Sequence, residues 1–437
     1  MKKALKKLVP QFVFKSYYYL LAFISAIIYH FPSNKMIVIG VTGTKGKTST
    51  INFIWSCLNA GGYKTGIIST ANIKIDNREF LNNYHMTMPG KFAIQSLMSE
   101  MVRSGCKFCI IETTSEGIKQ YRNIGINYDI VVFTNLFPEH LPSHNNSFDE
   151  YKDTKGKLFK NLINSKRKKI LNREIEKIII TNSDSDHSNY FSSFKADKKI
   201  SYSIKNNSNN RAVDIIPNIN GVNFSLNEDQ YNLSILGKFN VYNALPAIII
   251  SRLFNIENDK IKQGLNTLKV IPGRMEIINE GQNFMVIVDY AHEKESMTNL
   301  LETANSIKSS DSKIIVLLGA EGGGRDKAKR PLMGKICAEL ADYVIVTNVD
   351  PYEDDPKEII EDIAVSSEQN GKIRNENLFT IEDRRTAIKK AFALAKQDDI
   401  VLLTGKGAEQ SMIINGQTIP WDDRIVVKEE LKAYKAN

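Results

Sequence analysis

Short apolar runs that end in glycine or a polar residue alternate with helix-like stretches along this 437-residue chain. The first such runs lie at 36–39, 108–111, 130–134 and 178–181, and helical patterns occupy 48–60, 91–103 and 150–164. Four or five apolar residues between turn signals are typical of strands buried on both faces. The alternation predicts an α/β fold with a mostly parallel sheet covered by helices.

The second half of the chain repeats this alternation. Apolar runs at 285–289, 314–318, 343–347 and 400–404 are separated by further helical patterns. Between the two series, residues 195–235 are polar and rich in asparagine, with an Asn220-Gly221 turn signal, and a helical pattern follows at about 242–254. We expect the 195–235 segment to form antiparallel hairpins at one edge of the first sheet.

Length and composition describe a multi-domain globular protein. A chain of 437 residues exceeds one ordinary core, and 42% hydrophobic with 24% charged residues excludes a disordered or membrane-embedded chain. A net charge of +9 suits a polyanionic small substrate, an anionic membrane, nucleic acid or a merely solvated basic surface. The lysines are not interleaved with aromatic residues, so we expect no nucleic-acid partner.

Four cysteines in so long a chain do not form a disulfide framework, which indicates a reducing compartment. Cys106 and Cys109 form a lone C-x-x-C that opens an apolar run. Since there is no second cysteine pair, we expect buried structural thiols rather than a zinc site.

Residues 1–35 form a basic and apolar segment of their own. Four lysines in the first seven residues precede a 15-residue apolar run, 17–31, which is shorter than the roughly 20 residues that span a bilayer. No small-residue cleavage site follows, which argues against a signal peptide. The segment either lies in a membrane interface or packs as a helix on the protein or on a second subunit.

The strongest local motif is a phosphate-binding loop, Gly40-Val41-Thr42-Gly43-Thr44-Lys45-Gly46-Lys47-Thr48, placed between a strand and a helix. Backbone N–H groups at Gly43, Thr44, Gly46 and Ser49 can surround phosphate oxygens. Lys47 brings a positive charge to the β- and γ-phosphates, and the Thr48 hydroxyl can bind Mg²⁺. The loop predicts ATP or GTP binding but does not identify the reaction.

Further motifs follow in order and resemble those of the Mur ligase family. The loop is similar to the family's T-G-T-x-G-K-T, and Glu112 to Gly117 resembles its E-x-S-S-H-G, with Glu116 in place of His. The other matching segments are Thr134 to Leu141, Tyr151 to Phe159, Gly237 to Ala244, Pro272 to Glu276, Asp289 to His292, and Gly324 to Gly334. The series covers nearly the whole chain from residue 36 and most resembles the MurE-type branch, which adds the third residue of the cell-wall peptide.

This resemblance implies an ATP-dependent amide ligase. ATP phosphorylates a peptide-precursor carboxylate, and an amino acid amine then displaces phosphate from the acyl phosphate. Two Mg²⁺ ions are implied, one held by Thr48 and Glu112, the other by His140 and a carbamylated lysine at position 155. The expected catalytic residues are Lys47, Lys155, His140, Arg325 and Asp326.

The resemblance also implies two ligase domains after the 1–35 segment. Residues 36–273 would form a central P-loop domain that binds ATP, with Asn243 at the adenine. Residues 274–437 would form a Rossmann-like C-terminal domain, in which Arg274 contacts the nucleotide phosphates and Asp289 the ribose.

The substrate residues follow from the same resemblance. Thr87, in Thr87-Met88-Pro89, matches a T-T-P element that touches the sugar-peptide substrate, and Thr114 and Ser115 belong to the E-x-S-S-like segment. The amino acid would be gripped by Gly405 and Glu409 of Gly405-Lys406-Gly407-Ala408-Glu409. Asp350-Pro351-Tyr352 stands where diaminopimelate-adding enzymes have Asn-Pro-Arg, so the usual partner of a distal carboxylate is missing. Acidic residues favour lysine instead, and both amino acids stay open.

Other readings remain. The chain resembles, less closely, folylpolyglutamate and cyanophycin ligases, and a P-loop ATPase module without ligase activity or a degenerate scaffold would share the loop. Family members carry a uridine-binding domain before the loop, where this sequence has residues 1–35, so a UDP-linked and a lipid-linked acceptor both stay open. We expect a cytoplasmic protein, placed at the inner face of the membrane if residues 1–35 touch lipid.

Overall fold

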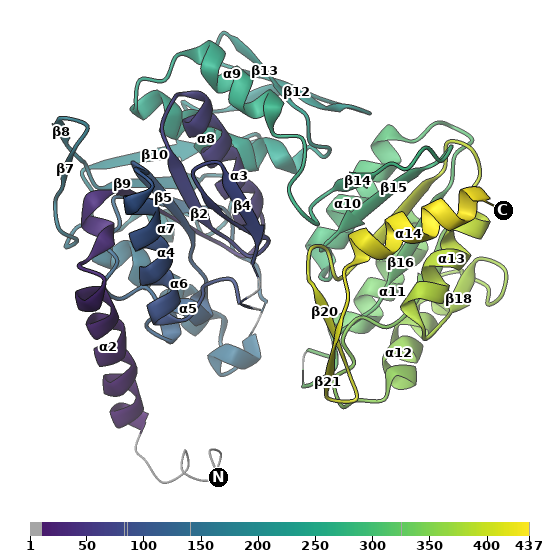
Figure 1. Cartoon of the computed structure of the whole chain (residues 1–437). Coiled ribbons are helices and arrows are strands. Elements are labelled where there is room, and N and C mark those ends of the chain that lie inside the picture. Colours follow the sequence, from purple (N-terminus) through teal and green to yellow (C-terminus); the bar gives the residue numbers. More distant parts are fainter. Residues whose placement is uncertain (1–10, 83, 85, 140, 325, 437) are drawn as a thin grey trace. The chain divides into compact units, whose positions relative to one another are not determined.

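A computed structural model describes residues 11–82, 84, 86–139, 141–324 and 326–436 (Figure 1). The chain divides into two compact units. The first contains the described residues up to Asp214, with Phe224–Asn232 and Asn240–Leu268, and the second contains Ile215–Asn223, Leu233–Phe239 and Lys269–Asn437. Each unit is described by itself below.

The first unit is built on an eight-stranded sheet of order β10-β9-β6-β1-β5-β2-β3-β4. Its strands are β1 (Ile37–Thr42), β2 (Thr65–Ile68), β3 (Asn72–Ile75), β4 (Arg78–Leu81), β5 (Phe108–Glu112), β6 (Ile130–Phe133), β9 (Ile178–Asn182) and β10 (Lys198–Tyr202). The six strands from β10 to β2 pair in parallel, and β3 and β4 extend the sheet as antiparallel strands. A mostly parallel sheet is confirmed.

Helices and short elements complete the first unit. They are α2 (Gln11–Ile28), η1 (Pro32–Lys35), α3 (Lys47–Ala60), α4 (Lys91–Arg103), α5 (Ser115–Lys119), η2 (Leu141–His144), α6 (Phe148–Leu162), α7 (Ser188–Ser192), α8 (Phe239–Leu253) and α9 (Asn258–Thr267), with the two-residue strands β7 (Lys169–Ile170) and β8 (Arg173–Glu174). None of the described helices combines the length and apolarity needed to cross a membrane.

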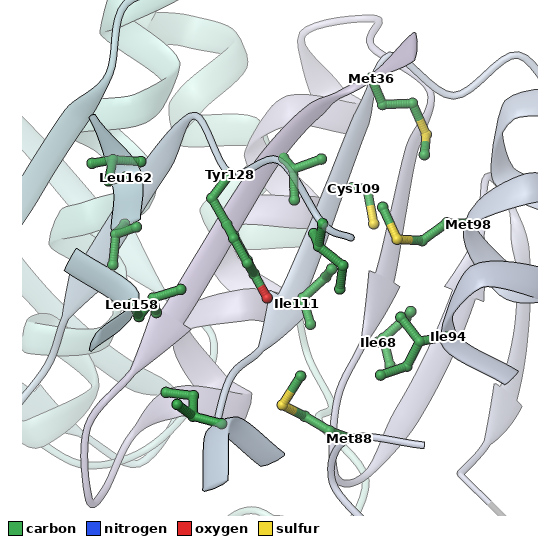
Figure 2. Packing of buried hydrophobic residues seen from close by; sticks show 14 of the residues in the cluster. Met36, Ile68, Met88, Ile94, Met98, Cys109, Ile111, Tyr128, Leu158 and Leu162 are labelled. Atoms are coloured by element: carbon green, nitrogen blue, oxygen red, sulfur yellow. The ribbon is translucent and has the colours of Figure 1, made fainter. Parts of the chain in front are cut away.

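One face of this sheet is packed by apolar residues of α4 and α6. Figure 2 shows Met98 and Ile94 beside Cys109 and Ile68, and Tyr128 near Leu158. The core also holds Cys106, and all four cysteines are free and buried, as expected for burial of their thiols. Alternate residues of β1 and β5 face the other side, where α3 contacts both strands, so both faces are covered and the strands are apolar up to Thr42 and Glu112 at their carboxyl ends.

The expectation of antiparallel hairpins for residues 195–235 at the sheet edge was wrong in two respects. β10 joins the first sheet in parallel with β9. The rest forms a separate three-stranded sheet of β11 (Ala212–Asn218), β12 (Gly221–Leu226) and β13 (Asp229–Leu233). The antiparallel edge comes instead from β3 and β4. Polar alternation identifies half-exposed strands, but it carries no information on which neighbour each strand pairs with.

The second unit contains a six-stranded sheet of order β14-β15-β19-β16-β17-β18, parallel except for the β14–β15 pair. Its strands are β14 (Glu276–Ile278), β15 (Met285–Asp289), β16 (Ile314–Leu318), β17 (Tyr343–Val346), β18 (Leu378–Thr380) and β19 (Ile400–Thr404), followed by the hairpin β20 (Ser411–Ile414) and β21 (Gln417–Pro420). The helices are α10 (Lys294–Ile307), α11 (Lys329–Leu340), α12 (Pro356–Gln369), α13 (Arg384–Leu394) and α14 (Asp423–Ala436).

Strand direction decides where the polar loops of each unit gather. In the first unit the segments that follow β1, β5 and β6 leave the same edge of the sheet, because these strands are parallel. In the second unit the segments after β15, β16, β17 and β19 do the same. Loops at the carboxyl edge of a parallel sheet form the usual binding crevice of α/β proteins, and most of the predicted site residues lie in these loops.

Candidate active site

The phosphate loop connects β1 to α3 and needs glycine at two positions. Gly43 has φ +149° and Gly46 has φ +78°. A β-carbon on Gly43 would overlap the Thr134 hydroxyl, and one on Gly46 would overlap the Asn243 side chain. The loop therefore lies against the segment after β6 and against α8, with the N-terminus of α3 at its end.

Contacts with the segment after β6 fix the loop conformation. The Thr44 N–H donates to the carbonyl oxygen of Asn135 (2.9 Å), and Phe137 N–H donates to Thr44 Oγ1 (3.0 Å). Lys45 Nζ lies 2.9 Å from Glu139 Oε1. Lys45, which stands where the family usually has Asn, therefore pairs with the carboxylate before position 140. Both the side chain and the backbone of Thr44 therefore anchor the loop to the segment after β6, and the Lys45 N–H donates to Asn135 Oδ1 (2.8 Å).

A carboxylate held by hydroxyl groups lies at the start of α3. Thr48 Oγ1 donates to Glu112 Oε2 (2.9 Å), and both residues are buried. Lys47 Nζ donates to the Thr44 carbonyl (2.8 Å) and lies 4.0 Å from Glu112 Oε1. A hydroxyl and a carboxylate oxygen side by side at the phosphate loop form a set of hard oxygen ligands that fits Mg²⁺. The structure thus brings together Lys47, Thr48 and Glu112.

Thr70, in the turn after β2, is a site residue that the sequence did not indicate. Its N–H donates to Glu112 Oε2 (2.8 Å) and its hydroxyl donates to Glu112 Oε1 (2.9 Å). The same hydroxyl lies 2.9 Å from Thr87 Oγ1. Thr70 therefore connects the predicted metal carboxylate to a predicted substrate residue. A polar turn after a short apolar strand was the one available signal, and it is too common to select Thr70.

Lys155 on α6 is buried beneath the phosphate loop. Its Nζ donates to the Gly43 carbonyl (2.9 Å) and lies over the ring of Tyr151. Burial lowers the pKa of this amine well below its usual value, and the positive charge of Lys47 lowers it further. A neutral amine is the form that reacts with CO₂, so the environment of Lys155 fits carbamylation, and the product would add an oxygen ligand next to the loop.

The predicted partner of Lys155, His140, lies outside the described residues. No group of three or more His, Cys, Asp or Glu side chains suited to a metal ion occurs among the residues that the structure describes. The two predicted ligand pairs are of another kind: one combines the Thr48 hydroxyl with Glu112, and the other combines a modified lysine at position 155 with His140.

Thr114 and Ser115 have local partners. Thr114 Oγ1 accepts from Gly117 N–H (3.1 Å) and so caps α5. Ser115 Oγ lies 3.1 Å from Nε2 of buried His144, and burial lowers the pKa of this histidine. Their predicted substrate contacts, like that of Thr87, stay predictions.

Asn243 on α8 reaches the phosphate loop. Its Oδ1 lies 3.5 Å from the Thr50 hydroxyl, and its Nδ2 donates to Asn240 Oδ1 (2.8 Å). This places an amide next to Gly46, as a nucleotide contact from α8 requires. Ser49 is buried in the first turn of α3.

A second group of predicted residues gathers in the second unit, around the turn that precedes β14. Gly273 has φ +62°, and a β-carbon there would overlap the backbone at Gly407 and Ala408. The guanidinium of Arg274 lies 4.3 Å from the ring centre of Tyr290. Asp289 accepts from Met275 N–H (2.7 Å) and Ala291 N–H (2.8 Å), so it also fixes this turn.

The loop after β19 carries a buried charge cluster that the sequence only partly indicated. Lys406 Nζ lies 2.7 Å from Asp350 Oδ2 and 2.6 Å from Glu409 Oε2, and Glu409 Oε1 accepts from the Tyr290 hydroxyl (3.0 Å). Burial alone would lower the pKa of Lys406, but the carboxylates of Glu409 and Asp350 outweigh it and raise the pKa. The two carboxylates thus favour the charged form of Lys406, which links Asp350 and Glu409, and Tyr290 joins them to Arg274.

Glycines bring the segment after β16 against Asp350-Pro351-Tyr352. A β-carbon on Gly322 would overlap the Pro351 carbonyl, and one on Gly323 would come within 2.8 Å of the Tyr352 ring. Gly405, with φ +100°, packs against Val349. The loops after β16, β17 and β19 therefore form one surface.

Asp326 and Arg325 belong to the same segment after β16. Asp326 is exposed and its Oδ1 accepts from Ala328 N–H (2.9 Å), which shapes the turn before α11. Arg325 lies outside the described residues.

Models of two protein families match this chain. Residues 41–251 match the Mur ligase middle domain, and residues 273–407 match the Mur ligase, glutamate ligase domain. The chain is 35% identical over 427 residues to a UDP-N-acetylmuramoyl-L-alanyl-D-glutamate--2,6-diaminopimelate ligase of Bacillus cereus, covering 97% of this chain and 84% of the relative. It is 34% identical over 421 residues to a UDP-N-acetylmuramyl-tripeptide synthetase of Roseiflexus sp., covering 94% and 81%.

Solved structures give the same fold. A UDP-N-acetylmuramoyl-L-alanyl-D-glutamate--2,6-diaminopimelate ligase superposes with a TM-score of 0.62 at 26% identity, covering 92% of this chain and 79% of the other. A folylpolyglutamate synthase of Mycobacterium tuberculosis superposes with a TM-score of 0.65 at 16% identity, covering 93% and 92%. At that identity the second likeness concerns the fold alone.

Proposed function

The chain belongs to the Mur ligase family, and from this premise we propose how its two groups of residues divide the reaction. It is an ATP-dependent, amide-forming ligase of the MurE type, which joins an amino acid to a peptide-precursor carboxylate and releases ADP and phosphate. Two contacts carry the assignment of roles. The carboxylate of Glu112 accepts from hydroxyl groups beside the phosphate loop, and the ammonium of Lys406 lies between two carboxylates.

In the first unit, we assign ATP binding to the phosphate loop, with Lys47 at the β- and γ-phosphates and Asn243 at the nucleotide. Thr48 and Glu112 would hold one Mg²⁺, and His140 with carbamylated Lys155 a second. Bound Mg²⁺ would supply charge stabilisation for phosphoryl transfer from ATP to the acceptor carboxylate. Thr70 keeps both oxygens of Glu112 oriented, and Lys47 adds positive charge beside them.

In the second unit, we assign the incoming amino acid to the surface formed by the loops after β16, β17 and β19. Lys406 stays charged and can hold the α-carboxylate, whereas Glu409 can accept from the α-amine. Arg274 and Asp289 would serve the nucleotide, and Arg325 and Asp326 the reacting group.

We propose L-lysine as the amino acid that is added. Tyr352 stands where diaminopimelate-adding enzymes have Arg, and the residues next to it, Glu353, Asp354 and Asp355, are acidic. Asp354 Oδ2 accepts from Gly323 N–H (3.1 Å), so this carboxylate belongs to the same loop surface. A cationic side-chain end fits such a surface better than a second carboxylate. Diaminopimelate is the alternative, because similar proteins are diaminopimelate ligases.

The test is a phosphate-release assay with ATP, Mg²⁺, a UDP-muramoyl dipeptide and a panel of amino acids. We expect phosphate release to require both the dipeptide and lysine, and the tripeptide product to appear by mass spectrometry. A Tyr352→Arg variant should shift the preference toward diaminopimelate by about 10-fold or more, because it restores a bidentate carboxylate partner. Preference of the unchanged chain for diaminopimelate would reject lysine and keep the ligase.

The same assay separates the remaining readings. Turnover of folate with glutamate, or of an aspartate polymer, in place of the muramoyl dipeptide would indicate another ligase of the superfamily. Substrate-independent hydrolysis that a Lys155→Ala change leaves untouched would indicate an ATPase module. Absence of any turnover would indicate a scaffold.

We place the reaction in the cytoplasm, where ATP and a UDP-muramoyl precursor are found, with residues 1–35 in peripheral contact with the inner face of the membrane. A lipid-linked acceptor would also be within reach there. Comparing a UDP-linked with a lipid-linked dipeptide in the same assay distinguishes the two acceptors.

A further inference from the structure

Helix α2 is attached to the first unit through its small residues. Ala22, Ser25 and Ala26 are 0–1% exposed. A β-carbon on Gly125, which has φ +77°, would contact Ala26, so this glycine lets the helix approach closely. Ser25 Oγ donates to the Ala22 carbonyl (2.7 Å), which removes its polarity from the contact. A narrow stripe of small side chains thus packs α2 closely against the first unit.

Most large apolar residues of α2 remain exposed, although Tyr19 packs against Tyr121 and Phe23 against Phe31. Seven of them are between 36% and 56% exposed: Tyr17, Tyr19, Leu20, Phe23, Ile24, Ile27 and Ile28. They make up one third of the 21 exposed large hydrophobic residues in the part of the chain that the structure describes. A helix that only covered its own unit would bury its large residues and expose its small ones. In α2 the small residues are buried and many of the large apolar residues are exposed, which indicates an apolar partner on the outer side of the helix.

The charge of the segment narrows the choice of partner. Residues 1–35 contain six lysines and no Asp or Glu. A second copy of the chain docked on the same face would bring two such lysine sets together, which is repulsive. An anionic lipid surface is complementary to them, and tyrosines are favoured at the headgroup level of a bilayer.

We propose that the outer face of α2 is a docking surface for an anionic phospholipid membrane, with the helix lying in the interface plane. The apolar side chains enter the acyl boundary, and the net positive charge of residues 1–35 attracts the anionic lipid. The proposed membrane contact is thereby assigned to one helix face and to one class of lipid. It rests on the exposed face of α2 and on charge, so it stands or falls separately from the ligase reaction.

The test is co-sedimentation of the full chain with vesicles. Vesicles of equal parts phosphatidylglycerol and phosphatidylcholine should bind at least about 10-fold more tightly than vesicles of phosphatidylcholine alone, and salt should weaken the binding. Replacing four lysines by glutamine should remove most of this lipid preference: Lys2, Lys3, Lys6 and Lys7.

A triple variant, Leu20→Gln with Ile24→Gln and Ile27→Gln, should lower vesicle binding by about 10-fold or more, because three apolar side chains no longer enter the bilayer. The matched control changes three isoleucines elsewhere, Ile216→Gln, Ile373→Gln and Ile425→Gln, which are 54–61% exposed and so overall more exposed than the α2 residues. It should bind vesicles like the unchanged chain. Circular dichroism and vesicle-free phosphate release should be the same for both variants.

Three results would overturn the proposal. The first is failure of the unchanged chain to bind phosphatidylglycerol vesicles. The second is equal loss of binding in the control triple variant. The third is a dimer in analytical ultracentrifugation that the α2 variant dissociates while vesicle binding is absent, which would assign the face to a second copy of the chain.

Discussion

Lys155 in the first unit and Lys406 in the second are both buried lysines, 2% and 1% exposed, yet the structure treats them in opposite ways. Lys406 lies within 2.7 Å of two carboxylates, which raise its pKa. Lys155 forms no ion pair with any described residue, donates to a backbone carbonyl, and has a strongly lowered pKa. The surroundings of Lys406 favour the charged ammonium, and those of Lys155 favour the neutral amine.

This difference shows that burial does not determine what a lysine does. Desolvation acts on both side chains and favours their neutral form. Two carboxylates reverse that effect at Lys406, whereas the positive charge of Lys47 adds to it at Lys155. A cation suits the binding of an amino acid carboxylate, and a neutral amine suits reaction with CO₂, so the environments match the proposed roles.

The largest expected effect is on stability and comes from Lys406→Met. Removing the ammonium leaves buried Asp350 without its cation, which should lower the free energy of unfolding by about 3–5 kcal/mol. Urea denaturation measures this. The double variant Lys406→Met with Asp350→Asn should recover most of the loss, because no buried charge is left unpaired. A single variant as stable as the unchanged chain would show that the cluster is not an ion pair.

Lys155→Met should affect activity rather than stability. Loss of the proposed metal ligand is expected to lower kcat by about 100-fold or more. The free energy of unfolding should not fall, because an unpaired lysine whose pKa is lowered in the fold opposes folding at neutral pH. Phosphate release in buffer that contains bicarbonate checks the first part, and urea denaturation in CO₂-free buffer checks the second.

The pH dependence of the two lysine variants sharpens the comparison. The native state binds fewer protons at Lys155 than the unfolded chain, so the stability of the unchanged chain relative to Lys155→Met should rise as pH rises toward the usual lysine pKa. At Lys406 the folded pKa is raised, so its contribution stays complete below the usual value and is lost only above it. The stability difference for Lys406→Met should therefore be equal at pH 7 and pH 9. The opposite pattern would contradict both assignments.

Thr70→Val should have a moderate effect, about a 10-fold loss of kcat with a higher Mg²⁺ concentration for half-maximal activity. The change removes the hydroxyl that orients Glu112 but keeps the backbone N–H. Thr70→Ser restores the hydroxyl and should restore the Mg²⁺ dependence. If serine did not rescue activity, Thr70 would have a packing role only.

The smallest effect is expected from Tyr290→Phe. It removes one hydrogen bond to Glu409, about 1 kcal/mol, and leaves the ring against Arg274. The KM for the amino acid should rise by about 5-fold with kcat little changed. A fall in kcat at constant KM would place Tyr290 at the reacting group instead.

Much of the fold was predictable because strands buried on both faces appear in the sequence as short uninterrupted apolar runs. β16 and β19 have the bounds that the apolar runs predict, since every residue of such a strand is buried on one face or the other. β3 and β4 were missed because they are short and partly polar. The pairing of β10 was wrong because the partner of a strand depends on segments elsewhere in the chain.

The site was predictable where its residues are close in sequence. The phosphate loop depends on two glycines and on the start of α3, all within ten residues. Thr70 lies 42 residues from Glu112, and Tyr290 lies 119 residues from Glu409, so no local pattern connects them. His140 and Arg325 lie outside the described residues, and their roles stay predictions.

The sequence by itself determined the apolar strands, the glycine positions that demand positive φ, and the ordered motifs of a Mur ligase. These depend on backbone sterics and on the burial of neighbouring residues in the chain. Only the tertiary structure decided which lysine is charged, which hydroxyls hold Glu112, and that α2 turns its large residues outward. The reason is that pKa values, hydrogen bonds and exposure depend on groups that folding brings together from distant parts of the sequence.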